Sequence, residues 1–140
     1  MHDRQLVQDY RKIRVWHDAR AFKRRIYALV TRFPAHEQYA LADQLRRSTR
    51  SISANIAEGF GKSSRWDCAR CLQTSLSEAG EVLNHLFDAL DLQFIDEPKF
   101  TELAEELRIL QRRLGALYFR IRPSGKDRRN AKPVQRRRRG

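Results

Sequence analysis

Glycine, proline and cysteine are scarce in this chain. Its 140 residues include six glycines, four prolines and two cysteines. Because turns depend heavily on glycine and proline, such low numbers predict a few long elements. Cys68 and Cys71 lie too close in sequence to join distant elements through a disulfide, so we expect reduced thiols.

Long apolar runs are also absent from the sequence. No run approaches the roughly 20 residues that a membrane-spanning helix needs. The N-terminal stretch MHDRQLVQDYRK lacks the apolar segment of a signal peptide. We therefore expect a soluble, cytoplasmic protein without a membrane partner.

Apolar residues recur in four stripes with alternating steps of three and four residues. This spacing is typical of helices that pack in a left-handed bundle, and no segment alternates with the period of a strand. The sequence predicts an all-α fold, an antiparallel up-down-up-down four-helix bundle. The stripes are Val15, Ala19, Phe22, Ile26, Leu29 and Phe33; Leu41, Leu45, Ser48, Ile52 and Asn55; Leu72, Leu76, Ala79, Leu83, Leu86 and Leu90; and Leu103, Leu107, Leu110, Leu114, Leu117 and Ile121.

Helix-ending and helix-starting residues separate these stripes. Pro34 interrupts the chain after the first stripe, and Gly59 and Gly61 favour an end to the second helix. Ser64 and the early Pro98 are typical of helix starts. The predicted helices span residues 13–33, 37–59, 64–92 and 97–121, within a bundle domain of residues 1–122.

Positive charge is in excess, and it is concentrated at the C-terminus. The formal net charge is +12, and residues 123–140 carry eight basic side chains against one carboxylate. This tail has no apolar periodicity, so we expect it to be disordered. A protein with this charge favours polyanions such as RNA or DNA. The candidate nucleic-acid-binding residues are Arg20, Lys23, Arg24, Arg46, Arg47, Arg50, Arg136, Arg137, Arg138 and Arg139.

The second predicted helix carries a polar row beside its apolar stripe. The row is flanked by small residues that allow another backbone to come close. Such a row is either a solvated face or a surface that hydrogen-bonds to a neighbouring helix or subunit. Aromatic residues near helix starts are further candidate contacts. The candidate oligomer interface comprises Gln44, Arg47, Ser51, Asn55, Glu58 and Trp16.

Motifs for catalysis and metal binding are incomplete. Cys68 and Cys71 form C-x-x-C, but no second pair of ligands completes a zinc site. None of the four histidines follows the Glu-x-x-His pattern of di-iron bundles, and no G-x-S-x-G string is present. The stretch GFGKSS precedes a helix and leaves phosphate docking open as an alternative to loop and cap chemistry. We expect no catalytic residues, metal or cofactor.

A longer pattern resembles a known family. The string FP-x-x-E-x-Y-x-L-x-x-QLRR ends at Arg47, and S-I-x-x-NIAEG-x-G follows from Ser51. Together with Trp16 and Ala19 in VWHDARAF, these strings resemble the four-helix-bundle family named for the 23S ribosomal RNA intervening sequence. The resemblance covers roughly residues 13–121.

The resemblance implies a small bacterial cytosolic bundle without enzymatic activity. Family members are similar to the accessory protein of diversity-generating retroelements, a cationic pentameric barrel that binds nucleic acid and a reverse transcriptase. By this likeness we expect a homopentamer that binds RNA or DNA through a cationic surface, with a reverse transcriptase as a further partner. The alternative is a protein-interaction scaffold with no direct role in nucleic-acid binding.

Overall fold

The computed structural model of the protein describes residues 9–124. Four helices make up most of this part: α1 (Arg14–Val30), α2 (Leu41–Phe60), α3 (Arg65–Asp91) and α4 (Glu97–Ile121). Short 3-10 turns occur at Tyr10–Lys12 and Ala35–Glu37, and residues 9–124 contain no strand. The predicted all-α four-helix bundle is thus confirmed, whereas most of the predicted disordered tail lies outside the described residues.

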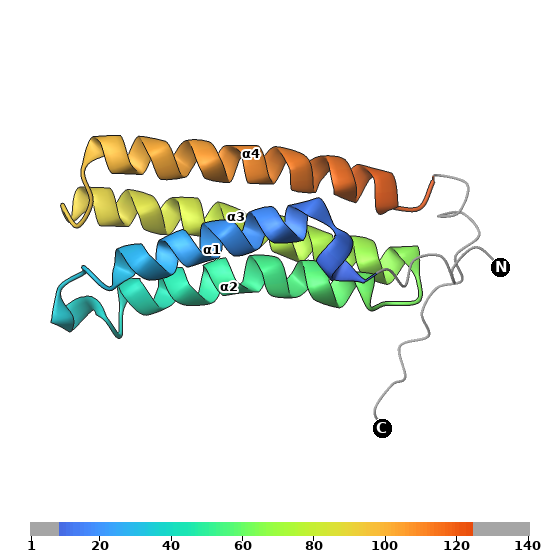
Figure 1. The fold of residues 1–140 in the computed structure, drawn as a ribbon, viewed down its shortest axis with the longest axis horizontal. Helices are drawn as coiled ribbons and strands as arrows, with labels where there is room; N and C mark the ends of the chain where they lie inside the picture. Colours follow the sequence, from blue (N-terminus) through green and yellow to red (C-terminus); the bar gives the residue numbers. More distant parts are fainter. Residues whose placement is uncertain (1–8, 125–140) are drawn as a thin grey trace, which may run out of the picture.

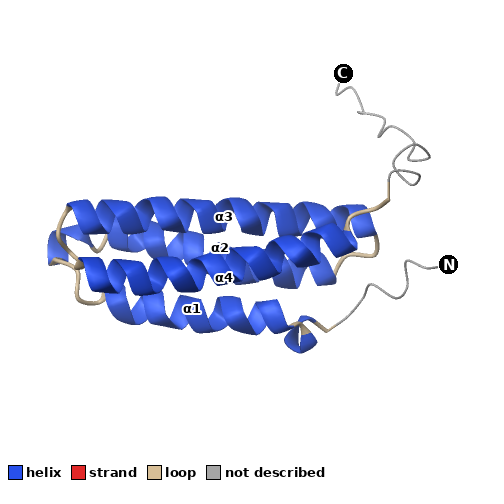
Figure 2. Cartoon of the chain, turned by 90° about the horizontal axis from the view of Figure 1, so that it is seen from above, coloured by secondary structure: helices blue, strands red, loops and turns tan. Residues whose placement is uncertain are grey.

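Consecutive helices run in opposite directions and lie side by side (Figures 1 and 2). The start of α1 and the end of α4 therefore lie at the same end of the bundle. Contacts between α2 and α3 are the most extensive, and those between α1 and α4 are the least extensive of the four neighbouring pairs. No described helix is both long enough and apolar enough to cross a membrane.

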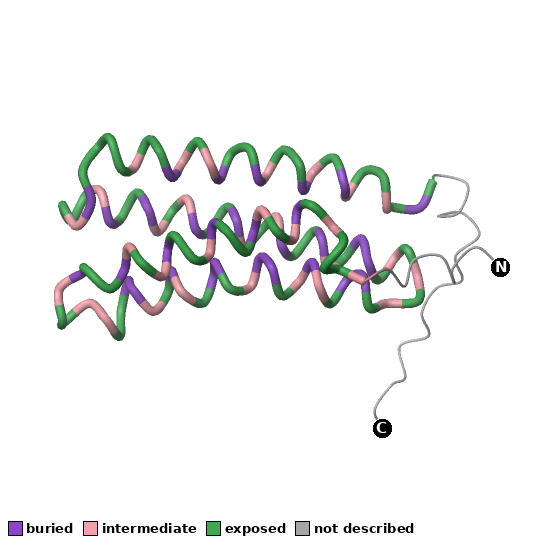
Figure 3. The backbone as a smooth tube through the Cα atoms, viewed as in Figure 1, coloured by how far each residue is buried: buried purple, intermediate pink, exposed green. Residues whose placement is uncertain are grey.

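The buried residues lie on the sides of the helices that face one another (Figure 3). The predicted stripes of α1, α2 and α4 supply most of this core, but α3 differs. Leu76, Leu83 and Leu90 are only partly buried, at the edge of the core. Each of these leucines is preceded by a fully buried residue, Ser75, Val82 or Ala89. Together with the buried Cys68, these residues form a second heptad stripe, which shares Leu72, Ala79 and Leu86 with the predicted one.

Small residues explain this choice of face, because they allow α2 and α3 to pack closely. Ser75 is fully buried, and its hydroxyl donates to the backbone carbonyl of Ile52 at 2.8 Å. A side-chain carbon added at Gly59 would lie 3.1 Å from Cys71 Cβ and 3.2 Å from the Cys68 carbonyl oxygen. Of the two glycines predicted to end α2, Gly59 therefore lies inside the helix, at a close approach to α3, whereas Gly61 follows its last residue.

The predicted ends of α3 and α4 are correct within one residue. Ser64 Oγ accepts from the Asp67 amide at 3.1 Å, and Asp96 Oδ1 accepts from the Lys99 amide at 2.9 Å. These bonds satisfy amides that the first turn of a helix leaves unpaired. The turn after α3 places Gln93 at φ 61°, the conformation that usually takes glycine.

The predicted boundary between the first two helices is wrong on both sides. Helix α1 ends at Val30 and not at residue 33, and α2 begins at Leu41 and not at residue 37. Extended Pro34 and the 3-10 turn that follows it occupy the interval. The Glu37 carboxylate accepts from the Leu41 amide at 3.3 Å, so Glu37 caps α2 from outside the helix.

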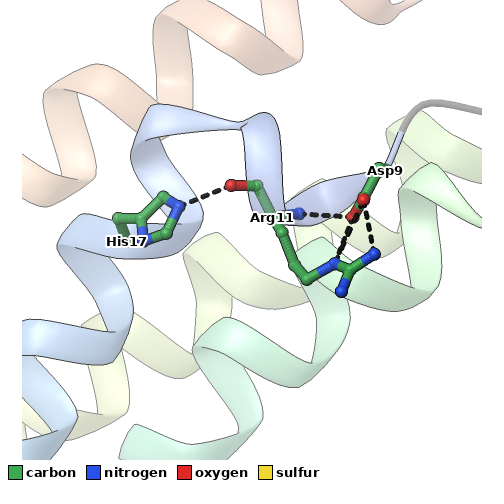
Figure 4. Close-up of polar contacts among 3 residues, drawn as sticks. All are labelled: Asp9, Arg11 and His17. Carbon is green, nitrogen blue, oxygen red and sulfur yellow. Dashed lines mark hydrogen bonds and ion pairs between the residues drawn. The ribbon is translucent and has the colours of Figure 1, made fainter.

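The described chain begins with a turn that packs on the start of α1 (Figure 4). Asp9 forms an ion pair of 2.7 Å with Arg11, and hydrogen bonds from Arg11 lower the pKa of Asp9 to about 2. His17 Nε2–H donates to the carbonyl oxygen of Arg11. These contacts fix the turn beside the half-buried ring of Trp16, whose centroid lies 5.0 Å from that of Tyr10.

Candidate nucleic-acid interface

Charge is divided unequally among the four helices. Helix α1 carries five arginine or lysine side chains and one carboxylate, and α2 carries three arginines and two carboxylates. Helix α3 has the opposite balance, with two cations and five carboxylates. Helix α4 is nearly balanced, with five cations and four carboxylates. Helix α1 therefore has the largest excess of positive charge, α2 and α4 each have an excess of one cation, and α3 is acidic.

Five of the predicted nucleic-acid-binding residues lie on neighbouring α1 and α2. Lys23 of α1 reaches Ser53 of α2, with Nζ 3.5 Å from Oγ, so both residues lie where the two helices meet. Arg20 and Arg24 lie within one turn of Lys23, and on α2 Ser53 follows Arg50 by three residues. Residues three and four apart share a helix face. We name this set the cationic face: Arg20, Lys23, Arg24, Arg46 and Arg50.

The carboxylates of α1 and α2 pair with cations that do not belong to the cationic face. Asp18 accepts from Arg113 of α4 at 3.0 Å, Asp43 pairs with Arg47 at 2.9 Å, and Glu58 approaches Lys62 at 3.6 Å. No ion pair within residues 9–124 involves a member of the cationic face. Its positive charge is therefore available to an external anion.

The members of the cationic face differ in exposure. Arg20, Arg24 and Arg50 are exposed, whereas Lys23 and Arg46 are half-buried. Arg46 has a structural role, because its guanidinium donates to the backbone carbonyl of Gln38 at 3.1 Å and to the Gln38 side-chain oxygen. The guanidinium of Arg20 lies 5.9 Å from the ring centroid of Trp16, at the other end of the face.

The remaining predicted binding residues are placed elsewhere. Arg47 lies on the side of α2 toward α3, where it pairs with Asp43. Residues 136–139, the four consecutive arginines of the tail, lie outside the described residues. The sequence-based set is thus one surface of five residues, one arginine on a neighbouring surface, and a tail without a described position.

The polar row of α2 borders a groove between α2 and α3. Gln44, Arg47 and Ser51 line it together with the buried Ser48. Asn55 continues the row, and its amide donates to Ser51 O at 2.8 Å and to Ser51 Oγ at 3.1 Å. The groove has a volume of about 530 Å³. Because the row faces an open groove and not the core, it is accessible to a further protein surface.

The opposite wall of the groove belongs to α3, and sequence reasoning missed it. Glu78, Glu81, Asn84 and His85 line this wall. Burial raises the pKa of Glu78, with the negative charge of Glu81 as a second cause. His85 Nδ1 is buried and has no hydrogen-bond partner among residues 9–124. Each of these residues lies three or four positions from another beside the core stripe of α3, and this spacing could have predicted that they share a face.

The two remaining predicted interface residues, Glu58 and Trp16, also have contacts within the chain. Glu58, at the end of the polar row, is exposed and approaches Lys62. Trp16 packs against the core and against the N-terminal turn, away from the groove. The structure therefore does not unite Trp16 with the polar row in one surface.

The side chains of the cationic face are suited to contacts with phosphate. Arginine side chains donate in a planar fork that suits phosphate oxygens, and several of them on one face can follow a phosphate backbone. Burial raises the pKa of Cys68 to about 11 and also that of Cys71, so both thiols stay protonated near neutral pH. Within residues 9–124, no three side chains of His, Cys, Asp or Glu gather as metal ligands.

Comparison with known proteins gives a family for this fold. No curated protein matches the chain. A family model described as 23S rRNA-intervening sequence protein matches residues 11–116. This range holds α1, α2 and α3 entire and most of α4, and therefore both the cationic face and the groove. The chain belongs to the 23S rRNA-intervening sequence protein family.

Proposed function

We propose that this protein is a non-catalytic, oligomeric bundle that binds RNA or DNA through the cationic face of α1 and α2. The observation that carries the proposal is a set of five cations on these helices that have no ion-pair partner within residues 9–124. The three carboxylates of the same two helices pair with other cations. Because no ion pair in the described part of the chain neutralises these five cations, their positive charge is available to a phosphate backbone.

The family supports RNA as one natural ligand. Its description refers to an intervening sequence of 23S rRNA, which links members to ribosomal RNA genes. The resemblance to the accessory protein of diversity-generating retroelements favours a second setting, in which the bundle works beside a reverse transcriptase. In both settings the protein contacts a phosphate backbone, and sequence choice is not required.

Oligomerisation would strengthen such binding. The polar row of α2 and the acidic wall of α3 provide hydrogen-bonding groups for a second copy, and the family resemblance favours a ring of five. A ring would combine several cationic faces into one larger surface. The groove equally favours the second candidate function, a scaffold that binds a different protein there.

Charge reversal on the cationic face tests the proposal. The double variant Arg24→Glu/Arg50→Glu changes two exposed members that have no ion-pair partner among residues 9–124. The matched control Arg112→Glu/Arg120→Glu makes the same change in net charge on exposed residues of α4 that also have no ion-pair partner among residues 9–124. Affinity for an RNA hairpin and a DNA duplex is measured by fluorescence anisotropy over a series of salt concentrations.

We expect the Arg24/Arg50 variant to bind more weakly than the control at every salt concentration. The slope of log affinity against log salt should fall by about 1 for each phosphate that the variant no longer neutralises. Equal weakening by both variants would show that only net charge matters and not this face. An unmodified protein that binds neither ligand at low salt would refute nucleic-acid binding and favour the scaffold.

A further inference from the structure

Tyr39 is the most exposed large apolar side chain among the described residues. Its exposed fraction is 95%, in the connection between α1 and α2. An aromatic ring in full contact with water gives up the favourable free energy that burial would provide. The packing of the bundle does not require a ring at this position, so Tyr39 is a candidate for contact with another molecule.

The backbone around Tyr39 is held in place by side-chain hydrogen bonds. Gln38 Nε2 donates to Val30 O at 2.9 Å and to Phe33 O at 3.0 Å, which ties the connection to the end of α1. Arg46 donates to the backbone carbonyl of Gln38, which ties the same residue to α2. Tyr39 therefore projects from an ordered support, and a ligand would not have to order the loop.

The backbone of Tyr39 lies at one end of the cationic face. Arg46 binds the residue immediately before Tyr39, and Arg50 follows one turn further along α2. With a rise of 1.5 Å per residue, Arg50 lies about 14 Å along the axis from the start of α2. The Glu37 carboxylate is occupied by the Leu41 amide. A strand that follows the arginines would thus reach Tyr39 within a few nucleotides.

We propose that the cationic face takes single-stranded nucleic acid and that one unpaired base stacks on the ring of Tyr39. The inference rests on the proposed function and adds the class of ligand. Single-stranded sites combine cations for the backbone with aromatic rings for the bases. In a duplex the bases are stacked on one another and cannot cover the ring.

The test compares the full-length protein with Tyr39→Ala and Tyr39→Phe. The control Phe119→Ala removes another exposed ring, which is 62% exposed on α4, away from the cationic face. The probes are a single-stranded RNA of about 12 nucleotides and the duplex of the same sequence. A second single strand carries 2-aminopurine, whose fluorescence falls when the base stacks.

We expect Tyr39→Ala to weaken single-strand binding about ten- to a hundred-fold, in line with the loss of one stacked base, and to leave duplex binding unchanged. Tyr39→Phe and Phe119→Ala should bind the single strand as the unmodified protein does. The 2-aminopurine signal should fall with the unmodified protein and with Tyr39→Phe, but not with Tyr39→Ala.

Other outcomes separate this inference from the proposed function. Binding of both probes that is insensitive to Tyr39→Ala would overturn the stacking role and leave the cationic face intact. No binding of either RNA probe or of the DNA duplex by the unmodified protein would refute the proposed function itself. A smaller assembly of Tyr39→Ala in light scattering would identify Tyr39 as a contact between protein copies and likewise overturn the inference.

Discussion

At the scale of single residues, polar side chains inside and beside α2 have several distinct uses. Arg46 anchors the preceding connection through Gln38, and Asn55 bonds to Ser51 within its own helix. The buried Thr49 hydroxyl has no hydrogen-bond partner within the described part of the chain. The residue types alone do not distinguish these uses, because each depends on what lies opposite in the bundle.

Cys68 gives the fold a dependence on alkaline pH. Burial raises the pKa of its thiol from 9.0 to about 11, so the folded state holds this proton more tightly than the unfolded state does. The thiol's contribution to stability is therefore complete below about pH 9 and is lost as the pH rises toward about 11. We expect the free energy of unfolding to fall in this interval by about 1–3 kcal/mol on account of Cys68.

Urea unfolding of the unmodified protein and of Cys68→Ala, from pH 8 to pH 11 in about six steps, isolates this contribution. Other groups that titrate in this range, including Cys71, are present in both proteins. The two stability curves should converge as the pH rises, because only the unmodified protein loses the Cys68 contribution. Parallel curves would contradict a raised pKa for this thiol.

At the scale of helices, the accuracy of sequence-based boundaries depended on local chemistry. The starts of α3 and α4 were predictable because Ser64, Asp96 and Pro98 act on the first turn that follows them. The start of α2 was not predictable, because the apolar spacing before Leu41 still suits a helix, whereas the chain there forms a 3-10 turn at Ala35–Glu37. A cap supplied by Glu37 from outside the helix has no short-range signature.

The face that α3 buries was only half predictable. Two heptad stripes run one residue apart, and they share Leu72, Ala79 and Leu86. The more hydrophobic one includes Leu76 and Leu83, which end up at the edge. Close packing with α2 favours small residues, so steric fit and not hydrophobicity decides which stripe faces inward.

The close approach of α2 to α3 yields a paired prediction on two glycines. Gly59→Ala places a methyl group 3.1 Å from Cys71 Cβ and 3.2 Å from a backbone oxygen, so we expect a loss of about 1–3 kcal/mol. Gly80→Ala, also in a helix, meets nothing within 4 Å and should gain about 0.5–1 kcal/mol. Thermal and urea unfolding measure both changes.

Opposite signs for these two variants would establish that packing at Gly59 outweighs the helix propensity of alanine. A stabilised Gly59→Ala protein would mean that α2 and α3 can separate without cost. Since both variants exchange glycine for alanine in a helix, effects on the unfolded chain are matched.

Much of the candidate site was also foreseeable, because basic residues at helical spacing must share a face. Arg20, Lys23 and Arg24 show this on α1. What the sequence did not indicate is the engagement of Arg46 by Gln38 and the wall that α3 adds to the groove. Both depend on the register between helices, which residue spacing within one helix does not determine.

At the scale of the whole molecule, the open polar groove suggests how copies of the bundle would meet. The variants Asn55→Leu and Arg47→Glu alter the polar row without touching the buried apolar residues. If this row lies between subunits, light scattering should give a smaller mass for both variants while circular dichroism retains the helical signal. The control is Arg112→Glu, which changes an exposed residue of α4 and should keep the mass of the unmodified protein.

An unchanged mass in both groove variants would contradict the interface assignment. A loss of helical signal would instead indicate unfolding, and then Gln44→Ala provides a milder change in the same row. Gln44 is exposed at the groove's edge, so its truncation leaves the core intact.

The unequal charges of α1 and α3 have a kinetic consequence. They give the bundle an electric dipole moment with a component across its width, from acidic α3 toward cationic α1. Near a long polyanion, this dipole experiences a torque that turns α1 and α2 forward before any atoms touch, and its reach shrinks with the Debye length as salt is added. Orientation during approach, and not only affinity after contact, is thus encoded in where the chain places its carboxylates.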